Sequence, residues 1–315
     1  MAMKFNQIFR AIYRFAGICS MVCLLALVNA TGLNAREGGT LYGVESGRNL
    51  VAIDLENVQI TEVGDIGFGV DGLAFHPPTG ELFGIGLVDS DRQLVRIDRS
   101  TGLGEVVGPI GFRNAGEIAY NPSNGGFYST AADSIGGPTS LIQIDAGTGA
   151  GDLIGETDFL GFSGLAYDDR DNSLFGVAAL VSDPSSTELV FVDSTTGTGV
   201  GGGRIDFTPE GFPTGLTYDP FSDQLLLSLQ GFSDPFGFFS VPQTIYGINK
   251  QTSEIESFTF FTPNYSIGSL AFVPNAIPEP GAGCVLMFGL TGSLCLLYTS
   301  PSPRDRTRSR MPSSA

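Results

Sequence analysis

The sequence predicts an all-β protein, a β-propeller of five four-stranded blades that is closed by pairing of its first and last strands. Three observations lead to this prediction: an internal repeat of short apolar segments, turn residues spread along the whole chain, and complementary fragments of the repeat at its two ends. The 315 residues include 44 Gly and 18 Pro. Together with frequent Ser, Thr and Asp, these residues favour many short strands and tight turns over long helices.

The predicted innermost strand of each blade is a short apolar segment that recurs at intervals of 45, 47, 51 and 54 residues. A second apolar segment begins nine residues after the Leu or Ile of the first four copies, and turn sequences such as "HPPTG" and "NPSNG" separate the two. Each such pair predicts a β-hairpin. The five copies of the innermost segment are Gly72–Phe75, Glu117–Tyr120, Gly164–Tyr167, Gly215–Tyr218 and Ser269–Phe272.

The third and fourth segments of the repeat carry two further pairs of residues. The third ends in an apolar residue followed by Asp, as in Ile97-Asp98, and Thr-Gly follows closely in three copies, as in Thr101-Gly102. An Asp that opens a turn accepts a hydrogen bond from the backbone two residues on, and Gly supplies the positive φ. The fourth segment contains an apolar–Gly pair, as in Val63-Gly64. Four short strands in each repeat are typical of a propeller blade.

The two ends of the repeat complement each other. The first unit lacks an innermost strand, whereas the last copy, Ser269–Phe272, has no strands after it. Pairing of Leu270–Phe272 with Leu41–Val44 therefore closes a ring and removes exposed sheet edges. Two alternatives stay open, a β-sandwich and a ring of six blades with strands hidden in the insert Gln230–Gln243.

Charge and cysteine content exclude several classes of function. The region Arg36 to Ala276 holds 9 Lys and Arg against 31 Asp and Glu, a net charge of −22. Such a body repels nucleic acid, so nucleic-acid binding is excluded. All four cysteines lie outside this region, which therefore has no disulfide, thiolate nucleophile or Cys metal site. It has no Trp and a single His, His76.

Residues 1–35 have the pattern of a signal peptide. A basic start containing Lys4, Arg10 and Arg14 precedes an apolar run, Phe15 to Val28, and small residues offer cleavage after Ala30 or Ala35. A retained membrane-anchoring helix is the alternative. This end predicts export.

Residues 275–294 contain Pro278-Glu279-Pro280 followed by the apolar run "GAGCVLMFGLTGSL". This arrangement resembles the PEP-CTERM sorting signal of exosortase-processed bacterial proteins. The resemblance implies transient anchoring in the inner membrane through the apolar helix, processing by an exosortase-type peptidase, and a place in the cell envelope or extracellular matrix of a Gram-negative-type bacterium. Residues 295–315 match a translated sequencing adapter, so the helix is interpreted as truncated near Leu294 and the Arg residues beyond it as artefact.

Residues 38–274 resemble secreted propellers of the quinoprotein, lactonase and NHL types in their general pattern. That resemblance implies the fold and no particular subfamily. The chain departs from the quinoprotein pattern because it has no Trp.

Two groups of residues are candidates for binding. The run "DDRDN" offers oxygen ligands for Ca²⁺ from Asp168, Asp169, Asp171 and Asn172, with a solvated hairpin turn as the alternative. His76 aligns with other turn-opening residues, so we expect a turn rather than a catalytic role. The second group lies on the face where the innermost strands begin, which is usually the binding face of propellers. This candidate ligand face comprises Asp71, Arg113, Glu117, Phe236, Phe238 and Phe239.

The sequence therefore predicts an exported binding or structural module of the cell envelope or exopolysaccharide matrix. No catalytic residues are evident, and a polysaccharide is the expected ligand because aromatic faces and carboxylates suit sugar rings. The alternative is a metal-assisted, Ca²⁺-dependent hydrolase or lactonase that uses carboxylates of the same face. Its hallmark would be a convergent, buried carboxylate cluster at the central channel.

Overall fold

The computed structural model describes residues 38–134, 137–180, 187–207, 211–231, 243–261 and 265–275. The signal peptide, the Pro278-Glu279-Pro280 motif with its apolar run, residues 295–315 and the three Phe residues of the insert lie outside this part of the chain. The described residues form strands and turns and include no helix long and apolar enough to cross a membrane.

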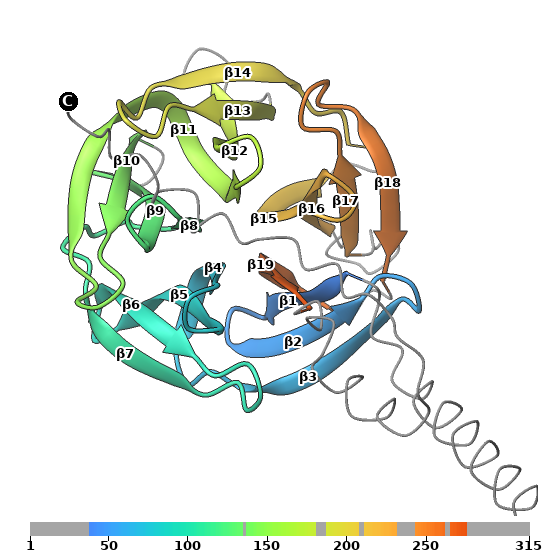
Figure 1. The fold of residues 1–315 in the computed structure, drawn as a ribbon, viewed down its shortest axis with the longest axis horizontal. Coiled ribbons are helices and arrows are strands. Elements are labelled where there is room, and N and C mark those ends of the chain that lie inside the picture. The colour runs from blue at the N-terminus through green and yellow to red at the C-terminus, as the bar shows by residue number, and fades with distance from the viewer. Residues whose placement is uncertain are drawn as a thin grey trace, which may run out of the picture. The chain divides into compact units, whose positions relative to one another are not determined.

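The described strands form antiparallel sheets that lie around a common axis, which is the arrangement of a β-propeller (Figure 1). Three sheets have four strands each, and a fourth sheet has seven. The seven-stranded sheet divides at its long strand β11, whose first part pairs with β10 and whose last part pairs with β12. Counting β11 on both sides gives five four-stranded groups, here called blades 1 to 5. The predicted β-sandwich alternative is wrong.

The strands of each blade follow the order of the repeat, from the axis outward. Blade 1 consists of β19 (Ile267–Pro274), β1 (Gly39–Glu45), β2 (Asn49–Asp54) and β3 (Gln59–Asp65). Blade 2 consists of β4 (Gly69–His76), β5 (Glu81–Val88), β6 (Asp91–Ile97) and β7 (Gly104–Pro109). Blade 3 consists of β8 (Ile118–Asn121), β9 (Gly126–Ala132), β10 (Pro138–Ile144) and the first part of β11 (Gly151–Asp168).

Blade 4 consists of the last part of β11 with β12 (Ser173–Leu180), β13 (Glu188–Val192) and β14 (Gly199–Arg204). Blade 5 consists of β15 (Gly211–Asp219), β16 (Gln224–Gly231), β17 (Thr244–Ile248) and β18 (Ile255–Phe260). The alternative of a sixth blade depended on the insert after β16, of which residues 232–242 lie outside the described part.

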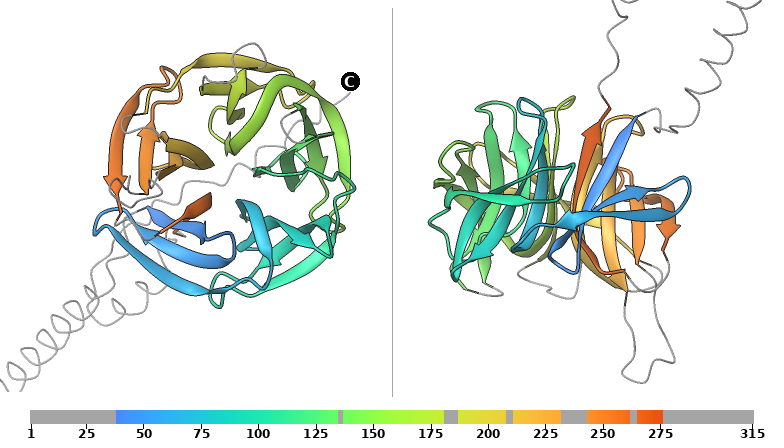
Figure 2. Two further views of the ribbon diagram at one scale, coloured as in Figure 1. Left: turned by 180° about the vertical axis from the view of Figure 1, so that it is seen from behind. Right: turned by 90° about the horizontal axis from the view of Figure 1, so that it is seen from below.

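The predicted pairing of the first and last strands is confirmed. Strand β1 runs antiparallel to β19, with Leu41 opposite Phe272 and Gly43 opposite Leu270. The backbone N–H of Asn275 also donates a hydrogen bond to the carbonyl of Gly38, at 3.1 Å. Both described ends of the chain therefore leave the same face side by side (Figure 2).

The hydrophobic core is divided among the spaces between neighbouring blades. One buried cluster joins blades 2 and 3 through Phe83 and Phe127, and another joins blades 5 and 1 through Leu226 and Leu270. Apolar side chains alternate along these strands because each strand turns one set of side chains to each neighbouring blade. The cluster between blades 5 and 1 buries apolar surface across the point where the two ends of the chain meet.

Two recurring residue pairs of the repeat contact each other between blades. Gly64 of β3 lies directly against the carbonyl of Thr101 in the next blade, where an added Cβ would overlap that oxygen. Gly102, at φ +80°, faces the backbone of Gly64 in return. The apolar–Gly and Thr-Gly pairs are therefore two halves of one close backbone contact, which recurs between blades 2 and 3 and between blades 3 and 4.

Candidate functional site

We call the face where the innermost strands begin the top face and the face where they end the bottom face. On the top face, the structure brings together two of the predicted residues, Asp71 in β4 and Glu117 just before β8. Burial raises the pKa of Glu117 to about 8, and the nearby charge of Asp71 adds to this effect. Glu117 is therefore mostly protonated at neutral pH, and it can donate a proton or a hydrogen bond there.

Two arginines of blades 2 and 3 accompany this pair on the top face. Asp71 is exposed and forms an ion pair with Arg92, with 2.5 Å between Nη1 and Oδ2. Arg113 is exposed in the loop that leads to Glu117. The described part of the predicted ligand face therefore offers two carboxyl groups, those of Asp71 and Glu117. The first is already paired with a cation of its own blade.

The predicted calcium cluster has a different partner in the structure. Lys250, in the turn after β17, inserts its ammonium among three carboxylates of two neighbouring blades. Its Nζ lies 2.5 Å from Asp168, 2.7 Å from Asp171 and 2.8 Å from Asp223. Lys250 is 6% exposed and the Asp168 side chain 0%. The ammonium occupies the position that a Ca²⁺ ion would need, so the structure does not support the calcium site.

The remaining members of that cluster have roles within the turn. Asp168 accepts a hydrogen bond from the backbone N–H of Arg170, and Asn172 accepts one from the hydroxyl of Tyr167. Asp169 has no part in either arrangement. No group of three His, Cys, Asp or Glu side chains that could hold a metal ion occurs within the described ranges.

Electrostatics bind Lys250 firmly in this position. Burial opposes its charge, but the hydrogen bonds to Asp168, Asp171 and Asp223 outweigh that effect and raise the pKa of Lys250. The hydrogen bond from Lys250 is also the main reason that the pKa of Asp223 lies below its ordinary value. The ammonium further lies over the ring of Tyr218, 5.3 Å from its centroid. Lys250 therefore joins blades 4 and 5 on the bottom face.

His76 has the predicted structural role at the start of its hairpin turn. Its Nδ1 lies 2.9 Å from the hydroxyl of Thr79, and its Nε2 lies 3.0 Å from the carbonyl oxygen of Gly125 in blade 3. The ring is 6% exposed and contacts Phe83 and Tyr120 edge-on. Both ring nitrogens are thus occupied in linking blades 2 and 3.

A cavity of about 280 Å³ lies at the bottom end of the central axis. All five innermost strands contribute to it an aromatic residue and the residue two places further on. Four of them also contribute the two residues before the aromatic one, an apolar residue followed by Ala or Thr. We call it the axial cavity. The aromatic positions are Phe75, Tyr120, Tyr167, Tyr218 and Phe272.

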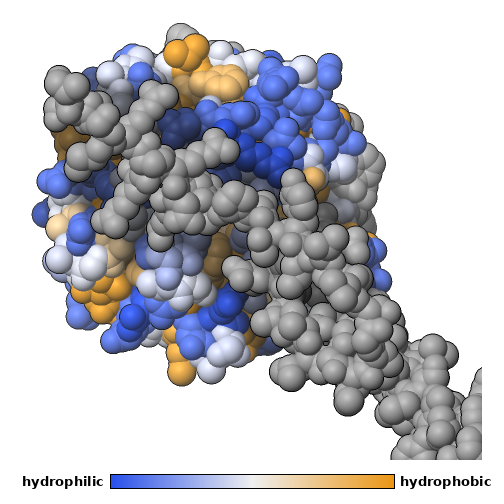
Figure 3. Space-filling model, viewed as in Figure 1, coloured by the Kyte–Doolittle hydropathy of each residue, from blue (hydrophilic) through white to orange (hydrophobic). Residues whose placement is uncertain are grey.

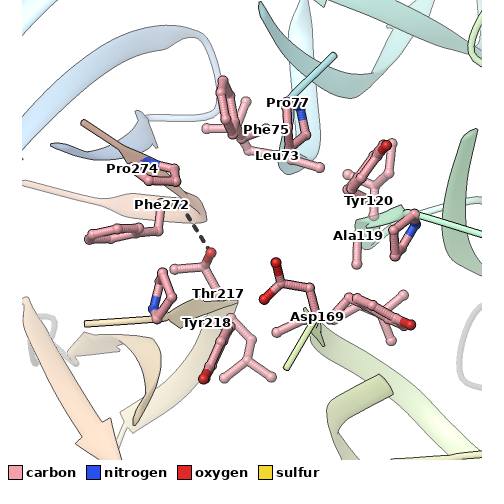
Figure 4. Close-up of a pocket in the computed structure, with 18 residues that line it drawn as sticks. Leu73, Phe75, Pro77, Ala119, Tyr120, Asp169, Thr217, Tyr218, Phe272 and Pro274 are labelled. Atoms are coloured by element: carbon pink, nitrogen blue, oxygen red, sulfur yellow. Dashed lines mark hydrogen bonds between the residues drawn. The ribbon is translucent and has the colours of Figure 1, made fainter. Parts of the chain in front are cut away.

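The interior of the axial cavity is apolar except for a few polar groups. In Figure 4 the rings of Tyr218 and Phe272 point away from the opening, whereas the carboxylate of Asp169 points into it. The hydroxyl of Thr217 also faces the opening and accepts a hydrogen bond from the backbone N–H of Phe272, at 3.1 Å. Small side chains such as Ala119 leave the central space open.

Asp169 departs from the repeat at the last of these positions. The equivalent position is proline in the other four blades, and Asp169 carries the only charge among the described residues that line the cavity. The four prolines are Pro77, Pro122, Pro220 and Pro274. Sequence reasoning counted Asp169 as a calcium ligand and overlooked the cavity, although the break in the proline pattern could have indicated it.

Among the described residues, the exposed apolar side chains outside the cavity do not gather into a second site. Figure 3 shows one face of the described surface as mostly polar, with apolar residues in small separate groups. Single exposed apolar residues such as Leu103, Leu153 and Val200 lie on different blades. Scattered residues of this kind are normal on protein surfaces.

Comparison with known proteins supports the fold. No family model matches the sequence, and no curated protein matches it. Among solved structures, a chain of a nidogen/laminin complex is similar with a TM-score of 0.52 and 11% identity, over 75% of this chain and 98% of that chain. At this identity the likeness is one of fold alone.

Two further solved structures are similar at lower scores. TolB from Acinetobacter baumannii has a TM-score of 0.47 and 12% identity, over 76% of this chain and 55% of that chain. A PQQ-bound aldose sugar dehydrogenase from Streptomyces coelicolor has a TM-score of 0.45 and 16% identity, over 74% of this chain and 81% of that chain.

Proposed function

We propose that the protein is an exported, carbohydrate-binding module of the cell envelope or exopolysaccharide matrix. The observation that carries this proposal is the axial cavity, an apolar space at the centre of a rigid ring with one carboxylate and one hydroxyl directed into it. Ligand sites of this kind combine apolar walls with few polar groups that orient the ligand. The cavity's 280 Å³ suits a single sugar unit rather than a long oligosaccharide.

The proposed location rests on the two ends of the chain. A signal peptide at residues 1–35 directs export, and the Pro278-Glu279-Pro280 segment with its apolar run is processed by an exosortase-type peptidase after transient anchoring in the inner membrane. Fractionation of bacteria that carry the native gene tests this location. Protein retained in the cytoplasm, or left unchanged in size by loss of the peptidase, would contradict it.

A binding assay tests the carbohydrate part of the proposal. The purified protein is titrated by calorimetry with a panel of neutral, acidic and amino-sugar oligosaccharides. We expect the protein to bind one of these three classes of oligosaccharide. Its affinity should fall in Ala119→Leu, because the larger side chain fills the open space of the cavity. The control is Leu153→Ala, because this exposed side chain lies on the outer strand. Failure of the whole panel to bind would overturn the proposal.

A second candidate function is a hydrolase or lactonase that acts on the top face. It is favoured by Glu117, whose raised pKa keeps a proton available near neutral pH, as a general acid requires. Lactone hydrolysis by the purified protein, compared with that by Glu117→Gln, tests it. Equal rates in the two proteins would reject Glu117 as the acid.

A further inference from the structure

The carboxylate of Asp169 in the axial cavity is accessible to a positively charged partner. No described residue donates a hydrogen bond or forms an ion pair with this carboxylate. Its acidic neighbours Asp168 and Asp171 are bound by Lys250 instead. Asp169 is exposed, and in Figure 4 it projects into the open centre. An exposed carboxylate in the lining of an apolar cavity can accept charge-assisted hydrogen bonds from a ligand in that cavity.

The surroundings of Asp169 carry a net negative charge. Two cations, Lys250 and Arg170, lie on this part of the bottom face. Arg170 is directed to the carbonyl of Pro220 and to Asp223, 3.8 Å away, so neither cation is available to Asp169. Three carboxylates, those of Asp168, Asp171 and Asp223, pair with these two cations, and the protein body as a whole is strongly acidic. This field attracts cationic ligands to the cavity mouth and repels acidic ones.

A metal ion is a poor match for this carboxylate. Calcium requires six to eight oxygen ligands, and Asp169 is the only carboxylate among the described residues of the cavity. An ammonium group needs one carboxylate and a few further acceptors. The hydroxyl of Thr217, which faces the same opening, is one such acceptor.

We infer that the axial cavity selects a sugar unit with a free ammonium group, and that Asp169 is the residue that sets this specificity. This inference rests on the proposed carbohydrate function and names the class of ligand. Asp169 and the hydroxyl of Thr217 bind the ammonium, and the apolar walls cover the faces of the sugar ring. Neutral sugars lack the ion pair, and acidic sugars are repelled by the same carboxylate.

Three oligosaccharides of equal length separate the elements of this inference. The full-length protein is titrated by calorimetry with a glucosamine tetramer, its fully N-acetylated form and a glucose tetramer. N-acetylation removes the positive charge and keeps the ring. We expect the glucosamine tetramer to bind about tenfold more tightly than the other two, as a charge-assisted hydrogen bond predicts.

Variants assign the preference to Asp169. In Asp169→Asn, and in Asp169→Pro, which restores the residue of the other four blades, the affinity for the glucosamine tetramer should fall to that for the glucose tetramer. The affinity for the glucose tetramer should not change. The control Asp152→Asn removes an equal charge from an exposed position on the first part of β11 and should keep the preference.

The outcomes distinguish this inference from the proposed function. Equal binding of all three oligosaccharides would overturn the ammonium specificity and leave carbohydrate binding standing. An equal loss in Asp152→Asn and Asp169→Asn would overturn the role of Asp169, because general charge attraction would then explain the preference. Absence of binding by all three would overturn both.

Discussion

Replacement of Lys250 by Met tests the electrostatic link between blades 4 and 5. The ammonium lies within 2.8 Å of a carboxylate oxygen of each of Asp168, Asp171 and Asp223. Met keeps most of the apolar stem and removes the charge. The change therefore leaves the three carboxylates without their shared cation and disturbs the packing little.

The burial of each carboxylate determines the size of the effect. Asp171 and Asp223 are 56% and 51% exposed, so water replaces Lys250 and each pair contributes about 0–1 kcal/mol. Asp168 is 0% exposed, and a buried charge that loses its partner costs about 3–5 kcal/mol. We therefore expect the free energy of unfolding to fall by about 3–5 kcal/mol at pH 7. For a domain of this size, the melting temperature should fall by roughly 6–20 °C.

The effect should depend on pH in a defined direction. In the native protein the pKa of Asp223 is lowered, so its contribution is present above its ordinary value of 3.8 and is lost as the pH falls through the lowered value. The pKa of Lys250 is raised, so its contribution is complete below 10.5 and is lost as the pH rises through the raised value. Lys250→Met should therefore be most harmful between these limits and progressively less harmful below about pH 4.

Urea unfolding of the purified protein between pH 3 and pH 8 measures this difference. Arg204→Met is the matched control, because Arg204 pairs with Asp206 at a site where the two side chains are 66% and 81% exposed. That variant should lose at most about 1 kcal/mol. A loss below 1 kcal/mol in Lys250→Met at pH 7, or a loss that does not change with pH, would refute the reasoning.

Three further predictions concern the inter-blade contacts and the top face. Gly64→Ala should lower the free energy of unfolding by about 1–3 kcal/mol, because its Cβ overlaps the Thr101 carbonyl. Gly69→Ala should change it little in the same urea assay, because its Cβ would lie 4.0 Å from its nearest neighbour, the carbonyl oxygen of Gly47. Leu270→Ala, in the strand that closes the ring, should cost about 2–5 kcal/mol, and a loss of under 1 kcal/mol would show that the pairing of the chain ends contributes little. The native protein should lose stability as the pH rises from 4.5 to 8, because folded Glu117 still holds a proton that the unfolded chain has released. This loss is at most about 5 kcal/mol, at about 1.4 kcal/mol per pKa unit. Glu117→Gln should abolish it. Parallel stability–pH curves for the native protein and this variant would contradict the assignment.

The repeat allowed the fold to be predicted because its local signals agree with the tertiary structure. Each Asp predicted to open a turn does so, as when Asp98 accepts hydrogen bonds from the N–H groups of Ser100 and Thr101. The turn-opening role of His76 is likewise confirmed. These interactions span a few residues, so the sequence pattern contains them directly.

The side-chain cluster of Lys250 could not be predicted in this way. Lys250 lies 82 positions from Asp168, and only the ring places their two turns together. Carboxylates that are close in sequence suggest a cation, but they do not indicate whether that cation is a metal ion or a distant ammonium. The axial cavity was missed for a related reason. It forms where five strands meet, so no single segment of the sequence contains all of the residues that line it.

The pairing of β1 with β19 has a mechanical consequence if the protein is held by its C-terminal end. A pull on residue 275 acts first on the pair Pro274–Gly39, at the end of the antiparallel ladder, so its hydrogen bonds come under tension one after another instead of together. Resistance then passes to the bonds that hold β19 to blade 5, including those from Thr214 and Ser228 to the carbonyl of Ile267. The ring should therefore open by peeling at low force, with β19 leaving first and the other four blades still folded.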